Sequence, residues 1–177
     1  LVLRQCVQLQ APLAVRWACL CHDLGKGTTP PDQWPRHHGH EGRSAQLARR
    51  VGERLRVPTD CRELADVVAR EHGNVHRSDG LNAAAVLRLL ERCDALRRPE
   101  RFEGLLLACA SDMRGRTGFE DRPYPPRERL SAALGAVLAA DTATVTRDAL
   151  AQGLPGPAIG QRVRDARLAA LGQALAT

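Results

Sequence analysis

An imidazole and a carboxylate stand side by side at His22 and Asp23, at the end of an apolar segment and directly before Leu24–Gly27. A buried carboxylate needs a partner, and a divalent cation shared with a neutral imidazole offsets the cost of removing its charge from water. The glycines and Lys26 that follow suit the approach of a phosphate. These residues predict a metal and phosphate site. The structural alternative is an aspartate paired with an arginine beside a histidine of the core.

Three further histidines, His37, His38 and His40, follow a proline-rich loop and directly precede a segment with helical spacing. Backbone N–H groups at the start of a helix favour an anion. A neutral histidine there can ligate a metal, whereas a protonated one can bind phosphate. We expect His40 to lie nearest the site, and His37 and His38 to line the loop.

His72 is predicted to end a later helix, with Gly73 as its C-cap. It is a candidate for contact with the substrate or with a metal ligand. A protonated histidine at a helix C-terminus is also explained by the helix dipole alone, and the sequence leaves both explanations open. His76 falls in a predicted loop and is interpreted as a surface residue.

Asp112 offers a second carboxylate from a separate predicted helix. Together with His22 and Asp23 it would form a site without thiolates, which suits Mg²⁺, Mn²⁺, Co²⁺ or Ni²⁺ better than a structural Zn²⁺. Arg114 and Arg116 follow closely and could hold a substrate phosphate. The alternative is that Asp112 is a surface residue at a helix end.

The elements that must position these residues are predicted to be helices. Hydrophobic residues make up 44% of the 177 residues but aromatic residues only 3%. The core must therefore consist of Leu, Ala and Val, which favours an all-α fold. The six cysteines lack disulfide or zinc spacing and are interpreted as core residues. Helical spacing predicts seven segments: Leu13–Leu24, Gly42–Leu55, Cys61–His72, Ala83–Leu96, Arg101–Asp112, Pro126–Ala139 and Ile159–Leu175.

The charge balance favours a polyanionic partner. The net charge is +6, and Lys26 is the single lysine among the basic residues. Arginines spread over solvated helix faces would give the same balance. The sequence has no signal-peptide pattern and no run of about 18 uncharged apolar residues, so we expect a cytoplasmic protein without a membrane segment.

The segment Cys21–Gly27 resembles the HD motif of the HD-domain metal-dependent phosphohydrolases. Two more segments, Thr28–Glu41 and Ser111–Glu120, narrow the resemblance to the multifunctional CCA family, the long bacterial CCA-adding tRNA nucleotidyltransferases. The similarity covers essentially the whole chain. It implies an HD helical bundle over residues 1–125 and a small helical tail over 126–177 that is a possible tRNA-binding segment.

The resemblance also implies an activity. In the family, the HD region follows a nucleotidyltransferase that rebuilds the 3′ CCA end in tRNA maturation and repair. The HD region acts as a 2′,3′-cyclic phosphodiesterase, 2′-nucleotidase and phosphatase. Ni²⁺ or Mg²⁺ is then the expected cofactor, and tRNA and 2′,3′-cyclic or 2′-phosphate nucleotides are the expected partners. Together with the position of each residue, the resemblance leads us to expect the following roles: metal ligands His22, Asp23 and Asp112, catalytic residues His22, Asp23, Lys26 and His72, and substrate-binding residues His40, Arg114 and Arg116.

Two departures from the family pattern define the alternatives. We find no segment with the paired acidic residues of a nucleotidyltransferase, and the family's first histidine ligand would fall just before Leu1. We therefore expect a fragment that binds metal weakly and can be inactive by itself. One alternative function is a tRNA-binding body with a vestigial HD site. Another is an HD domain that senses free nucleotides and has no tRNA affinity.

Overall fold

Helices make up all of the regular structure in the described part of the chain. A computed structural model describes residues 1–176. The all-α prediction is confirmed over these residues. The α-helices are α1 (Val2–Gln8), α2 (Leu13–Cys21), α3 (His40–Arg54), α4 (Thr59–His76), α5 (Ala83–Arg92), α6 (Pro99–Arg114), α7 (Pro125–Ala139), α8 (Thr142–Ala151) and α9 (Gly156–Leu175). Short 3₁₀ helices are η1 (Leu24–Thr28), η2 (Pro31–Gln33) and η3 (Ser78–Gly80).

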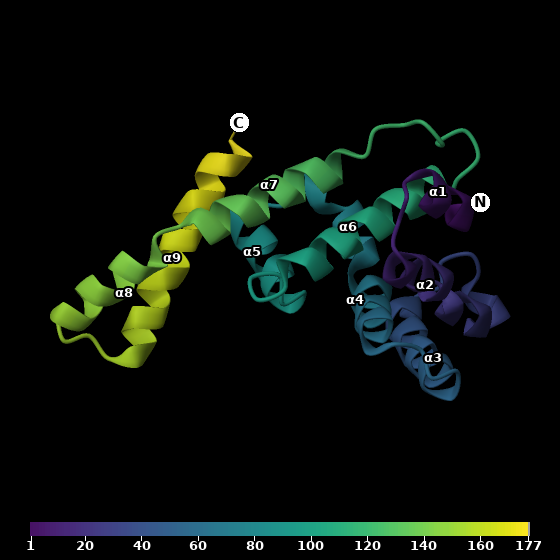
Figure 1. The fold of residues 1–177 in the computed structure, drawn as a ribbon, viewed down its shortest axis with the longest axis horizontal. Coiled ribbons are helices and arrows are strands. Elements are labelled where there is room, and N and C mark those ends of the chain that lie inside the picture. The colour runs from purple at the N-terminus through teal and green to yellow at the C-terminus, as the bar shows by residue number, and fades with distance from the viewer. Residues whose placement is uncertain (177) are drawn as a thin grey trace.

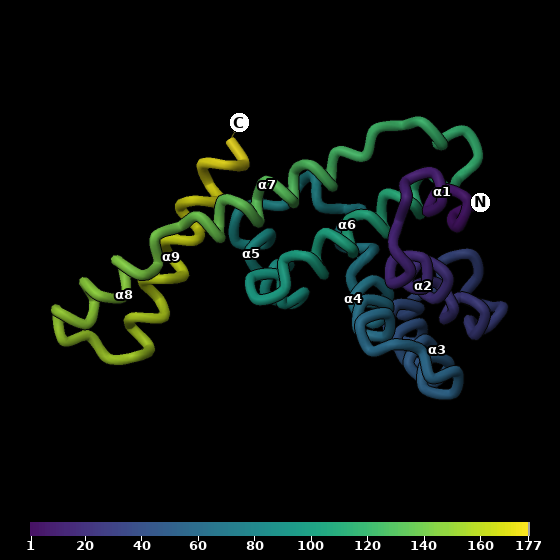
Figure 2. Tube along the Cα trace, viewed as in Figure 1, coloured from purple at the N-terminus to yellow at the C-terminus, as the bar shows by residue number. Residues whose placement is uncertain are grey.

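The helices form an elongated body (Figure 1). Helices α2, α3 and α4 gather at one end, α8 and α9 lie at the other, and α6 and α7 run between them. Helix α4 packs against α2, α3 and α6, while α9 packs against α5, α7 and α8. The trace in Figure 2 shows the chain leaving α6 beside α1 and returning through a long loop to the start of α7. Helix α4 and the end of α6 therefore meet beside α2, where the HD-like motif lies.

The core is built mainly of aliphatic residues and cysteines, as the composition predicts. Phe102 is its one fully buried phenylalanine and belongs to the same buried cluster as leucines and valines of α4, α5 and α6. All six cysteines are buried and free, which confirms their interpretation as core residues. The buried cluster continues from residues of α2 and α4 to Leu130 of α7 and Leu171 of α9. Apolar contact thus crosses the predicted division after residue 125.

Several predicted boundaries are wrong. Helix α2 ends at Cys21, so His22 and Asp23 lie in the turn after it and not inside its last turn. Helix α4 continues past His72 through Gly73 to His76, because the completely buried Val75 holds the last turn against the core. Helices α1 and α8 were not predicted. Helix α1 has only 7 residues, too few for a clear periodic pattern. Helix α8 buries only Ala149, so its sequence carries little apolar pattern. Among the described residues, no helix is both long and apolar enough to cross a bilayer.

Candidate metal centre

Side chains from three parts of the chain converge on one point. His22 and Asp23 follow α2, His72 lies in α4, and Asp112 lies near the end of α6. His22 Nε2 is 3.3 Å from Asp23 Oδ2 and 3.4 Å from Asp112 Oδ1. His72 Nε2 is 3.7 Å from Asp23 Oδ1, and one ligand atom each from His22, Asp23 and His72 lie within 4.8 Å of one another. The predicted combination of His22, Asp23 and Asp112 is therefore brought together, with His72 beside it.

His40 completes this cluster from the first position of α3, where Gly39 with φ 69° forms the N-cap. Its Nε2 lies 3.4 Å from Asp23 Oδ1. Separations of 3.3–3.7 Å are longer than good hydrogen bonds. They are close to the spacing of about 3.0–3.4 Å expected for atoms that share one ion about 2.1 Å away. The arrangement suits a shared cation better than direct pairing.

The tautomers of three histidines are set by the backbone. A carbonyl oxygen can only accept, so a ring nitrogen beside one must carry the proton. His22 Nδ1 donates to the carbonyl oxygen of Cys19 at 2.8 Å. In the same way, His40 Nδ1 donates to the carbonyl of His37 and His72 Nδ1 to that of Val68, both at 3.0 Å. In the neutral rings, each Nε2 therefore presents a lone pair toward the carboxylates. This is the form in which histidine binds metals.

Three of the converging atoms are buried without a hydrogen-bond partner among the described residues. They are His22 Nε2, His40 Nε2 and Asp23 Oδ1. Buried polar atoms are almost always satisfied, so three orphans facing one point require an explanation. A divalent cation at that point would satisfy all three. The donor set of imidazole nitrogens and carboxylate oxygens, without a thiolate, fits such an ion.

The charges of the cluster reinforce one another. Burial disfavours the charged form of His22, yet contacts with Asp112 and Asp23 outweigh it and raise the pKa of His22 to about 10. Burial likewise opposes ionisation of Asp23 and Asp112, but their histidine partners hold both pKa values well below the usual range. For His72, burial and the neighbouring His22 lower the pKa, so this ring is neutral at pH 7. Without metal, a proton on His22 takes the place of the cation.

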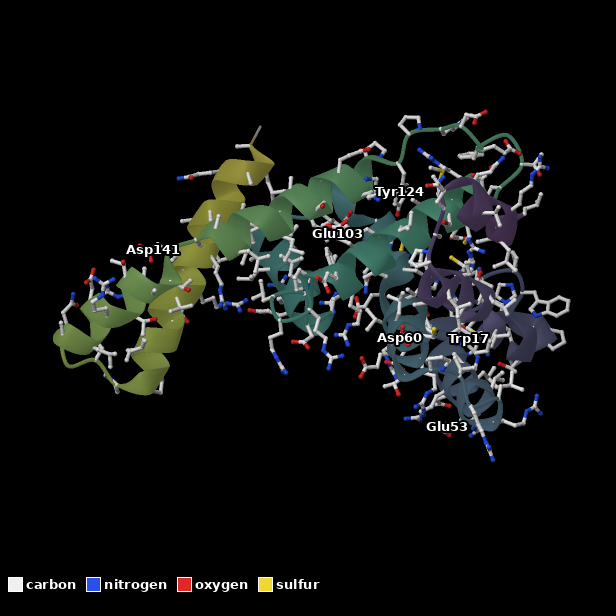
Figure 3. The ribbon with its side chains drawn as sticks, in the orientation of Figure 1. Trp17, Glu53, Asp60, Glu103, Tyr124 and Asp141 are labelled. Carbon is white, nitrogen blue, oxygen red and sulfur yellow. The ribbon has the colours of Figure 1, made fainter. Side chains whose placement is uncertain are left out.

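His76 belongs to the site, and its interpretation as a surface residue is wrong. It is the last residue of α4, and its Nε2 lies 3.0 Å from Asp112 Oδ2. Because a carboxylate only accepts, Nε2 donates this bond and Nδ1 accepts from the hydroxyl of Tyr124, 2.8 Å away. Tyr124, labelled in Figure 3 at the start of α7, is buried. The result is a hydrogen-bonded line from α7 through α4 to the α6 carboxylate.

The cluster opens into a pocket of about 420 Å³. Three basic side chains line it, those of Lys26, Arg77 and Arg116. Lys26 Nζ lies 2.6 Å from Asp23 Oδ2, and Arg116 Nη2 lies 3.7 Å from Asp112 Oδ2. The positive rim over a metal-like cluster fits an anionic substrate. Arg77 was not predicted as a site residue, and its only signal in the sequence was its place one residue after His76.

Gly25 fixes the position of the motif against α3. A Cβ added there would lie 2.3 Å from the carbonyl oxygen of His40 and 2.6 Å from the backbone nitrogen of Ser44. The Gly25 N–H donates to Ser44 Oγ at 2.9 Å. Only glycine permits this backbone approach. The contact brings His40 against Asp23.

Other predicted residues lie outside the cluster. The structure does not bring Arg114 into the pocket, because its Nε donates to the carbonyl of Arg122 and it lines a different hollow. His37 supports the loop through Nδ1, 3.0 Å from Thr29 Oγ1, and His38 is exposed. Both therefore agree with the expectation that they line the loop.

Comparisons with known proteins found a family model and relatives that match the chain. Residues 2–98 match the family model described as HD domain. Relatives called Multifunctional CCA protein are 61% identical over 171 residues in Acidovorax sp. (strain JS42), 58% over 177 in Verminephrobacter eiseniae and 56% over 174 in Cupriavidus necator. These alignments cover 97%, 100% and 97% of the chain but only 40%, 43% and 41% of the relatives. The chain thus spans about 40% of the length of such relatives. No solved structure matches it significantly.

Proposed function

The chain belongs to the HD-domain family, and we propose that it is the metal-dependent phosphohydrolase part of a CCA-adding tRNA nucleotidyltransferase. One observation carries the proposal. Two histidine nitrogens and a carboxylate oxygen are buried, unpaired within the described chain and directed at one point, beneath a rim of basic side chains. A cation at that point and a phosphate at the rim together satisfy the cluster.

The proposed metal ligands are His22, Asp23 and Asp112, with His72 and His40 next to them. A divalent cation bound there would lower the pKa of a water molecule and would polarise a phosphoryl oxygen of the substrate. The donor set favours Ni²⁺ or Mg²⁺ in our proposal, with Mn²⁺ and Co²⁺ as further candidates. All four ions can be held by nitrogen and oxygen ligands and do not need a thiolate.

The protein's own groups prepare the site for a phosphate ester. Lys26 holds Asp23 by its ammonium group, is 40% exposed, and can turn to offset charge on a phosphate. Arg116, 62% exposed beside Asp112, can do the same. His72 is neutral with its lone pair at Nε2, so it can take up a proton but has none to give there. We therefore assign His72 to metal binding or proton acceptance.

The proposed substrates are 2′,3′-cyclic and 2′-phosphate ends of ribonucleotides, with tRNA as the macromolecular partner. The names of the relatives and the net charge of +6 support this choice. In this proposal residues 1–125 carry the hydrolytic site, and residues 126–177 form a helical tail that contacts tRNA. Helix α9 supplies the exposed Arg162 for such contacts.

The test is hydrolysis of 2′,3′-cyclic AMP in the presence of Ni²⁺ or Mg²⁺. We expect His22→Ala and Asp23→Ala to reduce the rate by at least about 100-fold, since each removes a ligand. His38→Ala is the matched control, because His38 is an exposed histidine outside the pocket. Equal rates in the wild type and in both site variants would contradict the proposal. Salt-sensitive tRNA binding without any hydrolysis would instead favour the tRNA-binding body.

A further inference from the structure

The last turns of α4 present an unusual face to the pocket. The pocket is lined by His72 and Gly73 and, one helical turn later, by His76 and Arg77. The two histidines face the carboxylates of the cluster. Gly73 is buried beside them, and Arg77 is exposed. This face therefore brings two histidines of the metal cluster and one arginine to the same pocket.

Gly73 has no backbone reason to be glycine. It lies inside α4 with helical geometry, where glycine weakens a helix. Its backbone is buried, and what fills the place of a side chain is the guanidinium of Arg77. A Cβ at Gly73 would lie 3.2 Å from Arg77 Nη2 and 3.4 Å from Nη1. The Arg77 side chain thus folds back along α4 and packs against the backbone of Gly73, a contact surface that we call the Gly73 platform.

Arg77 differs from the other cations of the rim in its partners. Lys26 and Arg116 each face a carboxylate of the cluster. Within the described chain, the one polar contact of the Arg77 side chain is a long one, from Nη2 to Asn74 Oδ1 at 3.5 Å. No carboxylate of the described residues lies within ion-pair distance of it. Most of the five N–H donors of Arg77 are therefore directed at solvent or at whatever enters the pocket.

We propose that Arg77, held on the Gly73 platform, is the phosphate-binding arginine of this pocket. Its ligand is the phosphate of a ribonucleotide ester, engaged through charge-assisted hydrogen bonds from the planar guanidinium. The inference rests on the proposed function for the identity of the substrate. Lys26 and Arg116 must leave a carboxylate partner to reach a phosphate. Arg77 has no such partner among the described residues.

The test measures binding of inorganic phosphate to the Mg²⁺-saturated chain by calorimetry. We expect Arg77→Gln to weaken phosphate binding by at least about tenfold and to leave the Kd for Mg²⁺ unchanged. Arg88→Gln is the matched control, because Arg88 is exposed on α5 and lies outside the pocket. An unchanged phosphate Kd in Arg77→Gln, or no phosphate binding by the wild type, would overturn the inference.

Gly73→Ala provides a second test that a merely structural role would not pass. Alanine strengthens the helix and displaces the guanidinium, so we expect Tm to rise by about 2–4 °C while phosphate binding weakens several-fold. Gly135→Ala is its control, since Gly135 lies within α7 with nothing within 4 Å of an added Cβ. It should raise Tm similarly and leave phosphate binding unchanged. Wild-type phosphate affinity in Gly73→Ala would refute the role of the platform.

These measurements separate the inference from the proposed function. Phosphate binding that depends on Arg77, in a chain that hydrolyses no ester, supports the inference and contradicts the hydrolase. Hydrolysis of 2′,3′-cyclic AMP with an unchanged KM in Arg77→Gln contradicts the inference and supports the hydrolase.

Discussion

Metal binding should displace a proton from His22. In the metal-free site the carboxylates of Asp112 and Asp23 raise the pKa of His22 to about 10, so the imidazole is protonated at neutral pH. A metal needs the Nε2 lone pair, and the proton must leave when the metal binds. With a pKa of about 10, the apparent Kd should decrease about tenfold per pH unit between pH 7 and pH 9, and about 500-fold in all between pH 7 and pH 10.

The sign of the effect on stability is opposite for the metal-free protein. A folded-state pKa raised above the ordinary value of 6.5 stabilises the fold below pH 6.5, and this contribution is lost as pH rises through about 10. The metal-free protein should therefore become less stable between pH 7 and pH 10. Over the same range, added Mg²⁺ should become increasingly stabilising.

The assay is calorimetric titration with Mg²⁺ at pH 7.5 in buffers of different ionisation enthalpy. We expect release of about one proton per bound ion, whereas a histidine with an ordinary pKa of 6.5 would release about one tenth. The His22→Asn variant should release few protons with the Mg²⁺ that it still binds, because an amide side chain carries no titrating proton. A pH-independent Kd between pH 7 and 9, without proton release, would refute the electrostatic description of the site.

Three further predictions concern the surroundings of the cluster. Gly25→Ala should destabilise the fold by about 2–4 kcal/mol in urea unfolding, because its Cβ would lie 2.3 Å from the His40 carbonyl oxygen, while Gly27→Ala should have little effect. Equal midpoints for the two variants would contradict this packing. Tyr124→Phe should weaken Mn²⁺ binding about tenfold, since it removes the partner of His76 Nδ1. An unchanged Kd, measured by the electron paramagnetic resonance of free Mn²⁺, would show that the tyrosine does not position the site. Mn²⁺ at 100 times its Kd should raise the unfolding free energy by about 2.7 kcal/mol, and identical thermal scans with and without metal would argue against a folded-state site.

The parts of the site that could be predicted were those carried by a local motif. His22 and Asp23 are adjacent, and the glycine and lysine after them mark the turn. Asp112 was identified from its own local segment, and the structure places its Oδ1 3.4 Å from His22. The all-α class followed from a composition poor in aromatic residues.

The parts that could not be predicted depend on tertiary contacts. Gly73 looks like a helix end in the sequence, so α4 was predicted to stop at His72 and the next turn was lost. Burial of Val75 overrides that local signal and carries His76 and Arg77 into the pocket. The i, i+4 spacing of the two histidines was the available clue. Arg114 was predicted to reach the pocket but does not, because a tertiary contact draws its side chain away to the Arg122 carbonyl.

The most direct test of the metal centre is anomalous X-ray scattering from crystals of the chain soaked in Mn²⁺. We expect one strong peak within about 2.5 Å of His22 Nε2 and of a carboxylate oxygen of Asp23 and Asp112, lost in an Asp23→Ala crystal. A peak elsewhere, or no peak at that point despite Mn²⁺ binding in solution, would contradict the assignment of these residues as the metal site.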